Sequence, residues 1–189
     1  MTRTYYHGSF TPDIQTFHPF SHFGSREAAI HVVAREMIEG KASKPFLYEV
    51  KINMPIDKTI ELADWNSPRP LLLVKSLIKD LDSDVVPKLK ELEAEIKTTH
   101  QYKAEVRLQF FEKIKKLLLP EIRGIYYKNK HEGPTNETSL CVVCSETIVE
   151  VKQVGLSVEE IRDSANKIAN KDTVYPRLNE VLNMITLPE

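Results

Sequence analysis

The chain of 189 residues has little cysteine, no long apolar run and almost no net charge. Its formal charge of −1 gives no reason to expect a nucleic-acid or membrane-surface partner through bulk electrostatics. No apolar stretch approaches the length of a membrane-spanning helix, and the first residues lack the apolar core of a secretory signal. We therefore expect a soluble protein without a membrane partner.

The only two cysteines, Cys141 and Cys144, form the sequence Cys-Val-Val-Cys. One such pair, without a second pair or a nearby pair of histidines, is weak evidence for zinc, and we predict no metal site. A redox pair normally begins a helix, whereas the flanking residues here are typical of a strand. The sequence favours two reduced, packed cysteines and a reducing compartment, either the cytoplasm or a host cytoplasm into which the protein is delivered.

Short apolar segments and turn signals predict an α+β domain. Ser25 is a plausible N-cap for a helix that Gly40 closes, and Ser157 with Glu160 forms a capping box for a later helix. Residues 45–52 alternate as a half-buried strand does. Strands are predicted at 3–6, 21–23, 45–52, 60–62, 124–127, 139–143 and 148–151, and helices at 26–39, 158–169 and 175–184.

Residues 66–121 differ in character from the rest of the chain. Val85, Leu89, Leu92 and Ile96 fall at helical spacing, as do four apolar residues between 106 and 117. This pattern predicts a helical hairpin inserted within a single domain that spans residues 1–189. Simple packing is the favoured role of the insertion, and capping a pocket or docking a partner is the alternative.

Polar residues gather where the predicted strands end, and strand ends of a small sheet commonly converge on one cleft. That cleft would hold imidazoles, hydroxyls, carboxylates and closely approaching backbone. It has no glycine-rich phosphate loop. The residues are His7 and Ser9 after the first strand, His22 and Ser25 around the second, and Glu132, Glu137 and Ser139 before the strand 139–143.

Several motifs resemble the ADP-ribosyltransferase superfamily, in particular its diphtheria-toxin-like and poly-ADP-ribose-polymerase-like branch. They are Tyr6-His7-Gly8-Ser9, then His22-Phe23-Gly24-Ser25 with Ala28-Ala29, then Tyr48-Glu49-Val50 with Ile52. Residues 124–133 and the strand 139–143 match the closing part of the pattern. The resemblance covers about residues 3–64 and 122–152. It implies an ADP-ribosyltransferase-like split β-sandwich that binds NAD between two small sheets, with the helical insertion and C-terminal helices outside it.

The resemblance also implies roles for individual residues. The histidine of the first motif, here His7, contacts the adenosine-side ribose, and the backbone of Gly8 holds the nicotinamide carboxamide, assisted by Ser9. An aromatic residue of the second motif stacks on nicotinamide, which matches His22 or else Phe23. The residues expected to bind NAD are His7, Gly8, Ser9, His22, Phe23, Gly24, Ser25 and Ser139.

The family's usual carboxylate at the start of the strand 139–143 is replaced here by Ser139. In the family this carboxylate holds the nicotinamide ribose and offsets positive charge as the glycosidic bond breaks. A serine can hold the ribose but supplies no charge. Glu137, and after it Glu132, are the residues expected to replace the carboxylate. Together with His22 they are the candidate catalytic residues.

Structural roles are the alternative for each of these residues. His22 could join an aromatic cluster of Phe17, Phe20 and Phe23, Ser25 is at least a helix cap, and both glutamates lie in a charged loop. The remaining histidines are expected in structural or surface positions. They are His18, His31, His100 and His131.

We therefore expect a mono-ADP-ribosyltransferase that cleaves NAD and transfers ADP-ribose to a macromolecular target, expected to be a protein. This is compatible with a bacterial effector, a phage-encoded modifier or a toxin. The alternative is a catalytically weakened NAD-binding pseudoenzyme that acts as an interaction module, as the serine at position 139 suggests. A third hypothesis is an adaptor in which the helical insertion dominates.

Overall fold

Two β-sheets and five helices make up the described part of the computed structural model, residues 2–40, 44–65, 69–99, 103–129 and 137–171. This arrangement confirms the predicted α+β class. The first sheet is antiparallel, in the order β1 (Thr2–Ser9), β3 (Phe46–Asn53), β7 (Ile148–Val154). The second has the order β2 (Ser21–Phe23), β6 (Thr138–Val142), β5 (Gly124–Lys128), β4 (Thr59–Leu62), with β4 parallel to β5.

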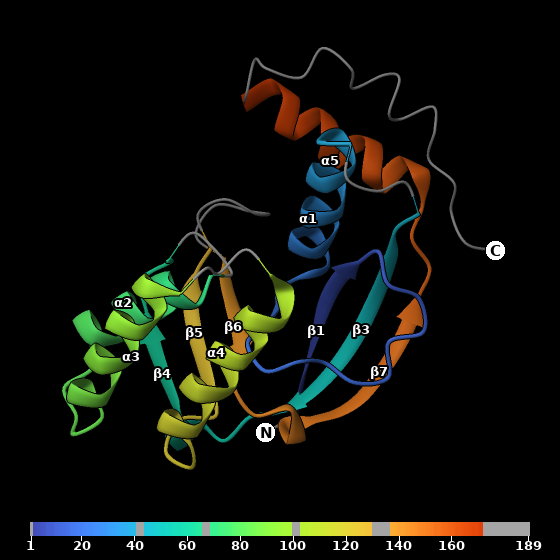
Figure 1. The fold of residues 1–189 in the computed structure, drawn as a ribbon. Helices are drawn as coiled ribbons and strands as arrows, with labels where there is room; N and C mark the ends of the chain where they lie inside the picture. The colour runs from blue at the N-terminus through green and yellow to red at the C-terminus, as the bar shows by residue number, and fades with distance from the viewer. Residues whose placement is uncertain (1, 41–43, 66–68, 100–102, 130–136, 172–189) are drawn as a thin grey trace.

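A single backbone bridge connects β1 of the first sheet to the end of β2 in the second. The N–H of Tyr6 donates to the carbonyl of Gly24 at 2.9 Å, and the N–H of Gly24 donates to the carbonyl of Tyr6 at 3.1 Å. Figure 1 shows the two sheets side by side, with helices α1 (Arg26–Ile38) and α5 (Val158–Lys171) together at one end of the first sheet. The bridge therefore lies where the two sequence motifs meet.

Strand β3 is buried on both faces over its first residues. Tyr48, Val50 and Ile52 pack in the core between the sheets, while Leu47 packs on the other side with residues of α1. The predicted half-buried pattern for residues 45–52 was therefore wrong at the start of the strand. The physical reason is that α1 covers the outer face there.

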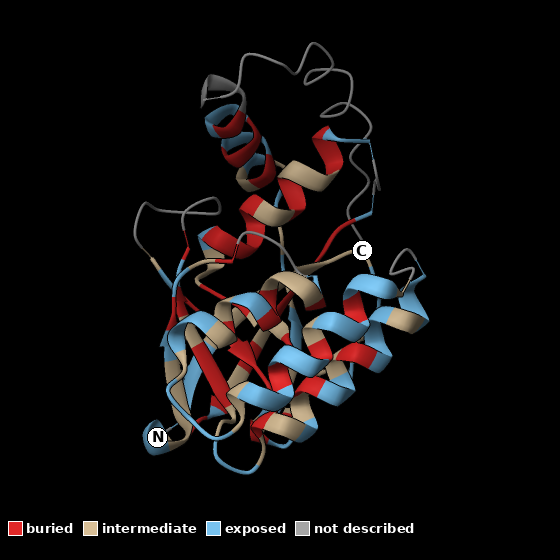
Figure 2. Ribbon diagram, turned by 60° about the vertical axis from the view of Figure 1, so that its left-hand side comes forward, coloured by how far each residue is buried: buried red, intermediate tan, exposed pale blue. Residues whose placement is uncertain are grey.

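Three helices lie between β4 and β5 in the chain: α2 (Pro70–Asp80), α3 (Val86–Thr98) and α4 (Ala104–Leu118). Their apolar residues pack with Ile125, Tyr127 and Cys141 of the second sheet. Figure 2 shows buried and exposed residues alternating along these helices. The prediction of a hairpin was wrong because it missed α2, whose run of consecutive apolar residues hides the helical spacing of its buried residues Pro70, Leu73, Val74 and Leu77.

The helices beside the first sheet begin as predicted. The Ser25 hydroxyl accepts a hydrogen bond from the N–H of Ala28 at 3.1 Å, and Gly40 after α1 has a φ of +73°. At α5, the Ser157 hydroxyl accepts from the N–H of Glu160 at 3.1 Å, and the Glu160 carboxylate accepts from the N–H of Ser157 at 2.9 Å.

Other predictions differ in detail. The strand predicted at 3–6 extends to Ser9, so the first motif lies within β1 and not after it. Cys141 and Cys144 are buried and form no disulfide, as predicted, and burial raises the pKa of Cys141. The helix predicted at 175–184 lies outside the described residues. None of the described helices is both long enough and apolar enough to cross a membrane.

Candidate functional site

The backbones of the two motifs separate after the Tyr6–Gly24 bridge. The side chain of His7, the residue after Tyr6, lies where they separate. Its Nδ1 is 2.8 Å from the backbone carbonyl oxygen of His22, and its ring packs edge-on against Phe17 at 4.9 Å between centroids. A carbonyl oxygen only accepts hydrogen bonds, so Nδ1 of His7 must donate. Burial lowers the pKa of His7, partly offset by this hydrogen bond. The ring is therefore neutral near pH 7, and its Nε2 is a hydrogen-bond acceptor.

The backbone polar groups of Gly8 point away from β3. In an antiparallel strand the N–H and C=O of alternate residues point to the same side. Tyr6 uses both groups in the bridge to Gly24, so those of Gly8 also point away from β3. Within the described part of the chain we find no hydrogen bond to either group. Gly8 thus presents one free donor and one free acceptor.

Gly8 also has a structural reason to lack a side chain. A Cβ placed on it would lie 2.3 Å from the carbonyl oxygen of Ala29 and 2.6 Å from Cγ2 of Val33. Both atoms belong to α1. The helix therefore lies so close to β1 at this position that only glycine fits.

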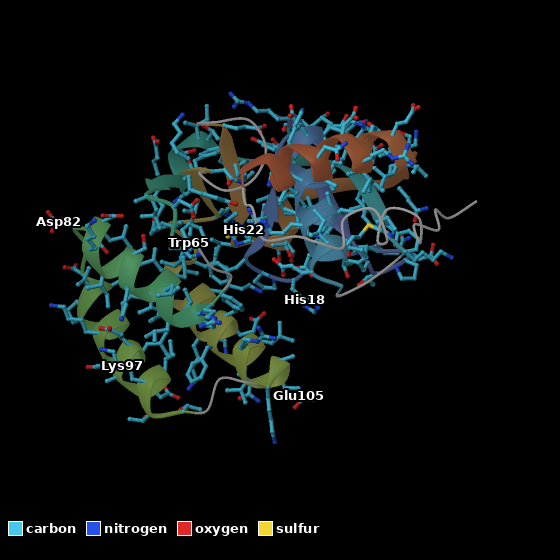
Figure 3. The ribbon with its side chains drawn as sticks, turned by 90° about the horizontal axis from the view of Figure 1, so that it is seen from above. His18, His22, Trp65, Asp82, Lys97 and Glu105 are labelled. Carbon is cyan, nitrogen blue, oxygen red and sulfur yellow. The ribbon has the colours of Figure 1, made fainter. Side chains whose placement is uncertain are left out.

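His22 is held by side chains that come from distant parts of the sequence. Its Nδ1 is 2.8 Å from the hydroxyl of Tyr127 on β5, and its ring centroid is 5.5 Å from that of Trp65, which follows β4. Figure 3 shows His22 and Trp65 near one another beside the helical segment. His22 thus joins an aromatic cluster, but not the predicted cluster of Phe17, Phe20 and Phe23.

Burial gives His22 an unusually low proton affinity. It lowers the pKa of His22 to about 4, with a further decrease from His7 and a partial opposing effect from the carboxylate of Asp64. The imidazole is therefore neutral over the physiological pH range. A neutral ring has one donor and one acceptor nitrogen, and Tyr127 occupies one of them.

Glu137 lies at the N-terminus of α1. Its Oε1 accepts a hydrogen bond from the N–H of Ser25 at 3.0 Å, where the positive end of the helix dipole favours a negative charge. Its Oε2 is buried and has no hydrogen-bond partner among the described residues. A buried carboxylate oxygen without a partner is rare in folded proteins, and such groups concentrate at functional sites.

Ser139 lies beneath Gly24. It is 2% exposed, and its hydroxyl accepts a hydrogen bond from the side-chain amide of Asn129 at 3.3 Å. A Cβ on Gly24 would be 3.2 Å from this hydroxyl. The serine therefore supports the backbone of the second motif, and its predicted contact with ribose stays a prediction.

Phe23 requires a correction, because it cannot supply the stacking surface that was considered for it. It is 1% exposed and lies in the core between the sheets with Phe17 and Leu140. Successive residues of a strand point to opposite faces, so Phe23 points into this core and His22 toward the helical segment. The backbone N–H and C=O of Gly24 are both used in the bridge.

The remaining predicted residues lie at the edges of this region. The Ser9 hydroxyl accepts a hydrogen bond from the N–H of Thr11 at 3.1 Å, and Ser25 caps α1. Glu132 lies outside the described residues, as do His100 and His131. His18 is exposed and His31 is buried, in agreement with the surface and structural positions predicted for them.

Sequence reasoning missed Trp65, Tyr127 and Asn129. Tyr127 reaches across β6 to β2, a pairing of strands that the sequence does not specify. A weak signal was present, since Trp65 is the only tryptophan of the chain and lies three residues after the predicted strand 60–62. Among the described residues no group of three or more histidine, cysteine or acidic side chains could hold a metal ion.

Comparison with protein-family models, with curated proteins and with solved structures gives no match to this chain in any of the three.

Proposed function

We propose that this chain binds NAD where the two motifs diverge, and that it transfers ADP-ribose to a macromolecular target, expected to be a protein. The observation that carries the proposal is the arrangement beyond the Tyr6–Gly24 bridge. There the neutral His7 donates to the backbone carbonyl of His22, next to the backbone groups of Gly8, which have no hydrogen bond among the described residues, and His22 is bonded to Tyr127. The resemblance of the same motifs to ADP-ribosyltransferases supports the same reading.

The backbone of Gly8 suits a carboxamide. A primary carboxamide carries one acceptor oxygen and a donor nitrogen, and a single extended residue offers the complementary N–H and C=O. Nε2 of His7 is an acceptor and therefore suits a ribose hydroxyl. These are the contacts expected for the nicotinamide and ribose groups of NAD.

Glu137 is the carboxylate proposed to assist bond cleavage. The bond between nicotinamide and the ribose C1′ breaks, and nicotinamide leaves with the bonding electron pair. An acceptor atom of the target then bonds to C1′ and releases its proton. The transition state carries positive charge on the ribose, which a fixed nearby carboxylate stabilises. The observation that favours Glu137 over Glu132 is its buried Oε2, which has no hydrogen-bond partner in the part of the chain that the structure describes.

The experiment is incubation of the protein with labelled NAD and a cell lysate, with detection of the labelled product. We expect wild type to transfer label and Glu137→Gln to transfer about 100-fold to 1,000-fold less, because one preorganised electrostatic contact is removed without loss of volume. Glu132→Gln is the matched comparison. Full activity of Glu137→Gln together with loss of activity in Glu132→Gln would assign the role of the assisting carboxylate to Glu132.

A second candidate is an NAD-binding interaction module without transferase activity. The specific observation in its favour is Ser139, a buried serine where related enzymes have the catalytic carboxylate. NAD binding by wild type without nicotinamide release, at any lysate concentration, would select this alternative. No binding of NAD to the folded protein would reject both.

A further inference from the structure

Tyr127 is the one hydrogen-bonding side chain found on the His22 ring within the described residues, and it reaches this ring from two strands away. Tyr127 pairs with Ser139 of β6, and His22 pairs with Cys141 of the same strand. Ser139 and Cys141 are two positions apart, so their side chains lie on the same face of β6, and both side chains are small. The phenol can therefore extend over β6 until its hydroxyl lies 2.8 Å from Nδ1 of His22.

The direction of this hydrogen bond follows from acid–base chemistry. The His22 ring is neutral, so one nitrogen carries a proton and the other has a free lone pair. A phenol is a stronger hydrogen-bond donor than a neutral imidazole N–H, and the imidazole lone pair is a stronger acceptor than a phenol oxygen. Tyr127 therefore donates to Nδ1, and the ring proton resides on Nε2.

The two histidines consequently have opposite polarity. His7 donates through Nδ1 to a backbone carbonyl, which leaves Nε2 as an acceptor. His22 accepts through Nδ1, which leaves Nε2–H as a donor. Trp65, 5.5 Å from the His22 ring and 5.0 Å from the Tyr127 ring between centroids, packs against both partners and fixes their orientation.

We propose that Tyr127 is a positioning residue that holds His22 in the Nε2–H tautomer, so that His22 donates a hydrogen bond to an oxygen atom of NAD while His7 accepts one from a hydroxyl. The proposal rests on the proposed function for its ligand, but not for the tautomer itself. It predicts that the phenol hydroxyl matters for ligand affinity although it does not touch the ligand.

The test is long-range ¹H–¹⁵N NMR of the full-length protein with ¹⁵N-labelled histidine, which distinguishes the two tautomers. In wild type at neutral pH we expect His22 in the Nε2–H form and His7 in the Nδ1–H form. Tyr127→Phe should weaken the preference at His22, leave the His7 signals in place, and weaken NAD binding by up to about tenfold, the most that the loss of one orienting hydrogen bond would cause. His22→Gln assigns the signals.

Tyr126→Phe is the matched control. Tyr126 is the neighbour of Tyr127 on β5 and points to the other face, where its hydroxyl lies 3.4 Å from that of Tyr5. The control should change neither the His22 tautomer nor the affinity for NAD. Thermal unfolding of both variants checks that each is folded.

Two results would overturn the proposal. One is an Nδ1–H tautomer for His22 in wild type, which needs no variant and no ligand. The other is a folded Tyr127→Phe protein that has lost the tautomer preference but binds NAD as wild type does. If wild type itself fails to bind NAD, the proposed function is rejected, and the wild-type and Tyr127→Phe spectra alone decide whether Tyr127 sets the tautomer.

Discussion

The two motifs, Tyr6-His7-Gly8-Ser9 and His22-Phe23-Gly24-Ser25, look alike in sequence but are built in opposite ways. In the first, the histidine is held by a neighbouring backbone carbonyl, and the glycine keeps its backbone groups free. In the second, the histidine is held by the side chain of Tyr127, which is distant in sequence, and the glycine uses both its N–H and its C=O in the bridge to Tyr6. The comparison teaches that the first motif contributes backbone groups as well as the His7 side chain to the proposed NAD site, while the second contributes the His22 side chain.

The largest expected effect separates the two glycines. Gly8→Ala would force a Cβ to 2.3 Å from the Ala29 carbonyl oxygen, a backbone atom that cannot rotate away, whereas Gly24→Ala meets its nearest atom at 3.1 Å. We expect Gly8→Ala to lower the free energy of unfolding by about 3 kcal/mol or more and Gly24→Ala by about 1 kcal/mol. Urea unfolding measures both. Equal losses would contradict the close approach of α1 to β1.

The next prediction tests the buried state of His22. Its folded-state pKa of about 4 lies below the unfolded value of 6.5, so the unfolded chain binds more protons between these two values. The stability that His22 contributes is fully present above pH 6.5 and falls by about 3 kcal/mol as the pH decreases to 4. His7 acts in the same direction, since its pKa is also lowered.

The measurement is the free energy of unfolding against pH for wild type and His22→Gln. Subtracting the two curves removes the titration of other groups, including His7 in so far as its pKa is unchanged. We expect the difference to vary between pH 6.5 and 4 and to be flat above. A flat difference throughout would mean that His22 is solvated and free to protonate in the folded protein.

A smaller effect is expected at the start of α1. Ser25→Ala removes the hydroxyl that accepts the N–H of Ala28 but keeps the backbone N–H that donates to Glu137. We expect a loss of about 1 kcal/mol in unfolding free energy, as for other N-cap residues, while the NAD affinity of the variant tests the ligand contact predicted for Ser25. Calorimetry of folded Ser25→Ala measures this affinity, and a large loss of affinity would assign a direct ligand contact to the hydroxyl.

Local interactions made much of this molecule predictable from its sequence. The cap at Ser25 and the capping box of Ser157 and Glu160 involve residues three positions apart, so their chemistry is visible in the chain. The strands were found from short apolar segments bounded by turns. Helix α2 was missed because its first residues are all apolar, which hides the face formed by the buried residues Pro70, Leu73, Val74 and Leu77.

The candidate site was less predictable because it depends on strand order. His22 and Tyr127 are 105 positions apart and meet only because β6 lies between β2 and β5. From the sequence, His22 is the preferred stacking residue and Phe23 is the alternative. Only the position of the second sheet, with the first sheet on one face and helices on the other, decides which of them is buried in the core between the sheets.

Titration calorimetry of NAD with the full-length protein tests the central claim most directly. We expect saturable binding by wild type, at least tenfold weaker binding by His7→Ala, which removes the acceptor Nε2, and unchanged binding by the control His18→Ala, whose histidine is exposed. Folded wild-type protein that gives no binding signal at millimolar NAD would contradict the claim that the divergence of the two motifs is an NAD site.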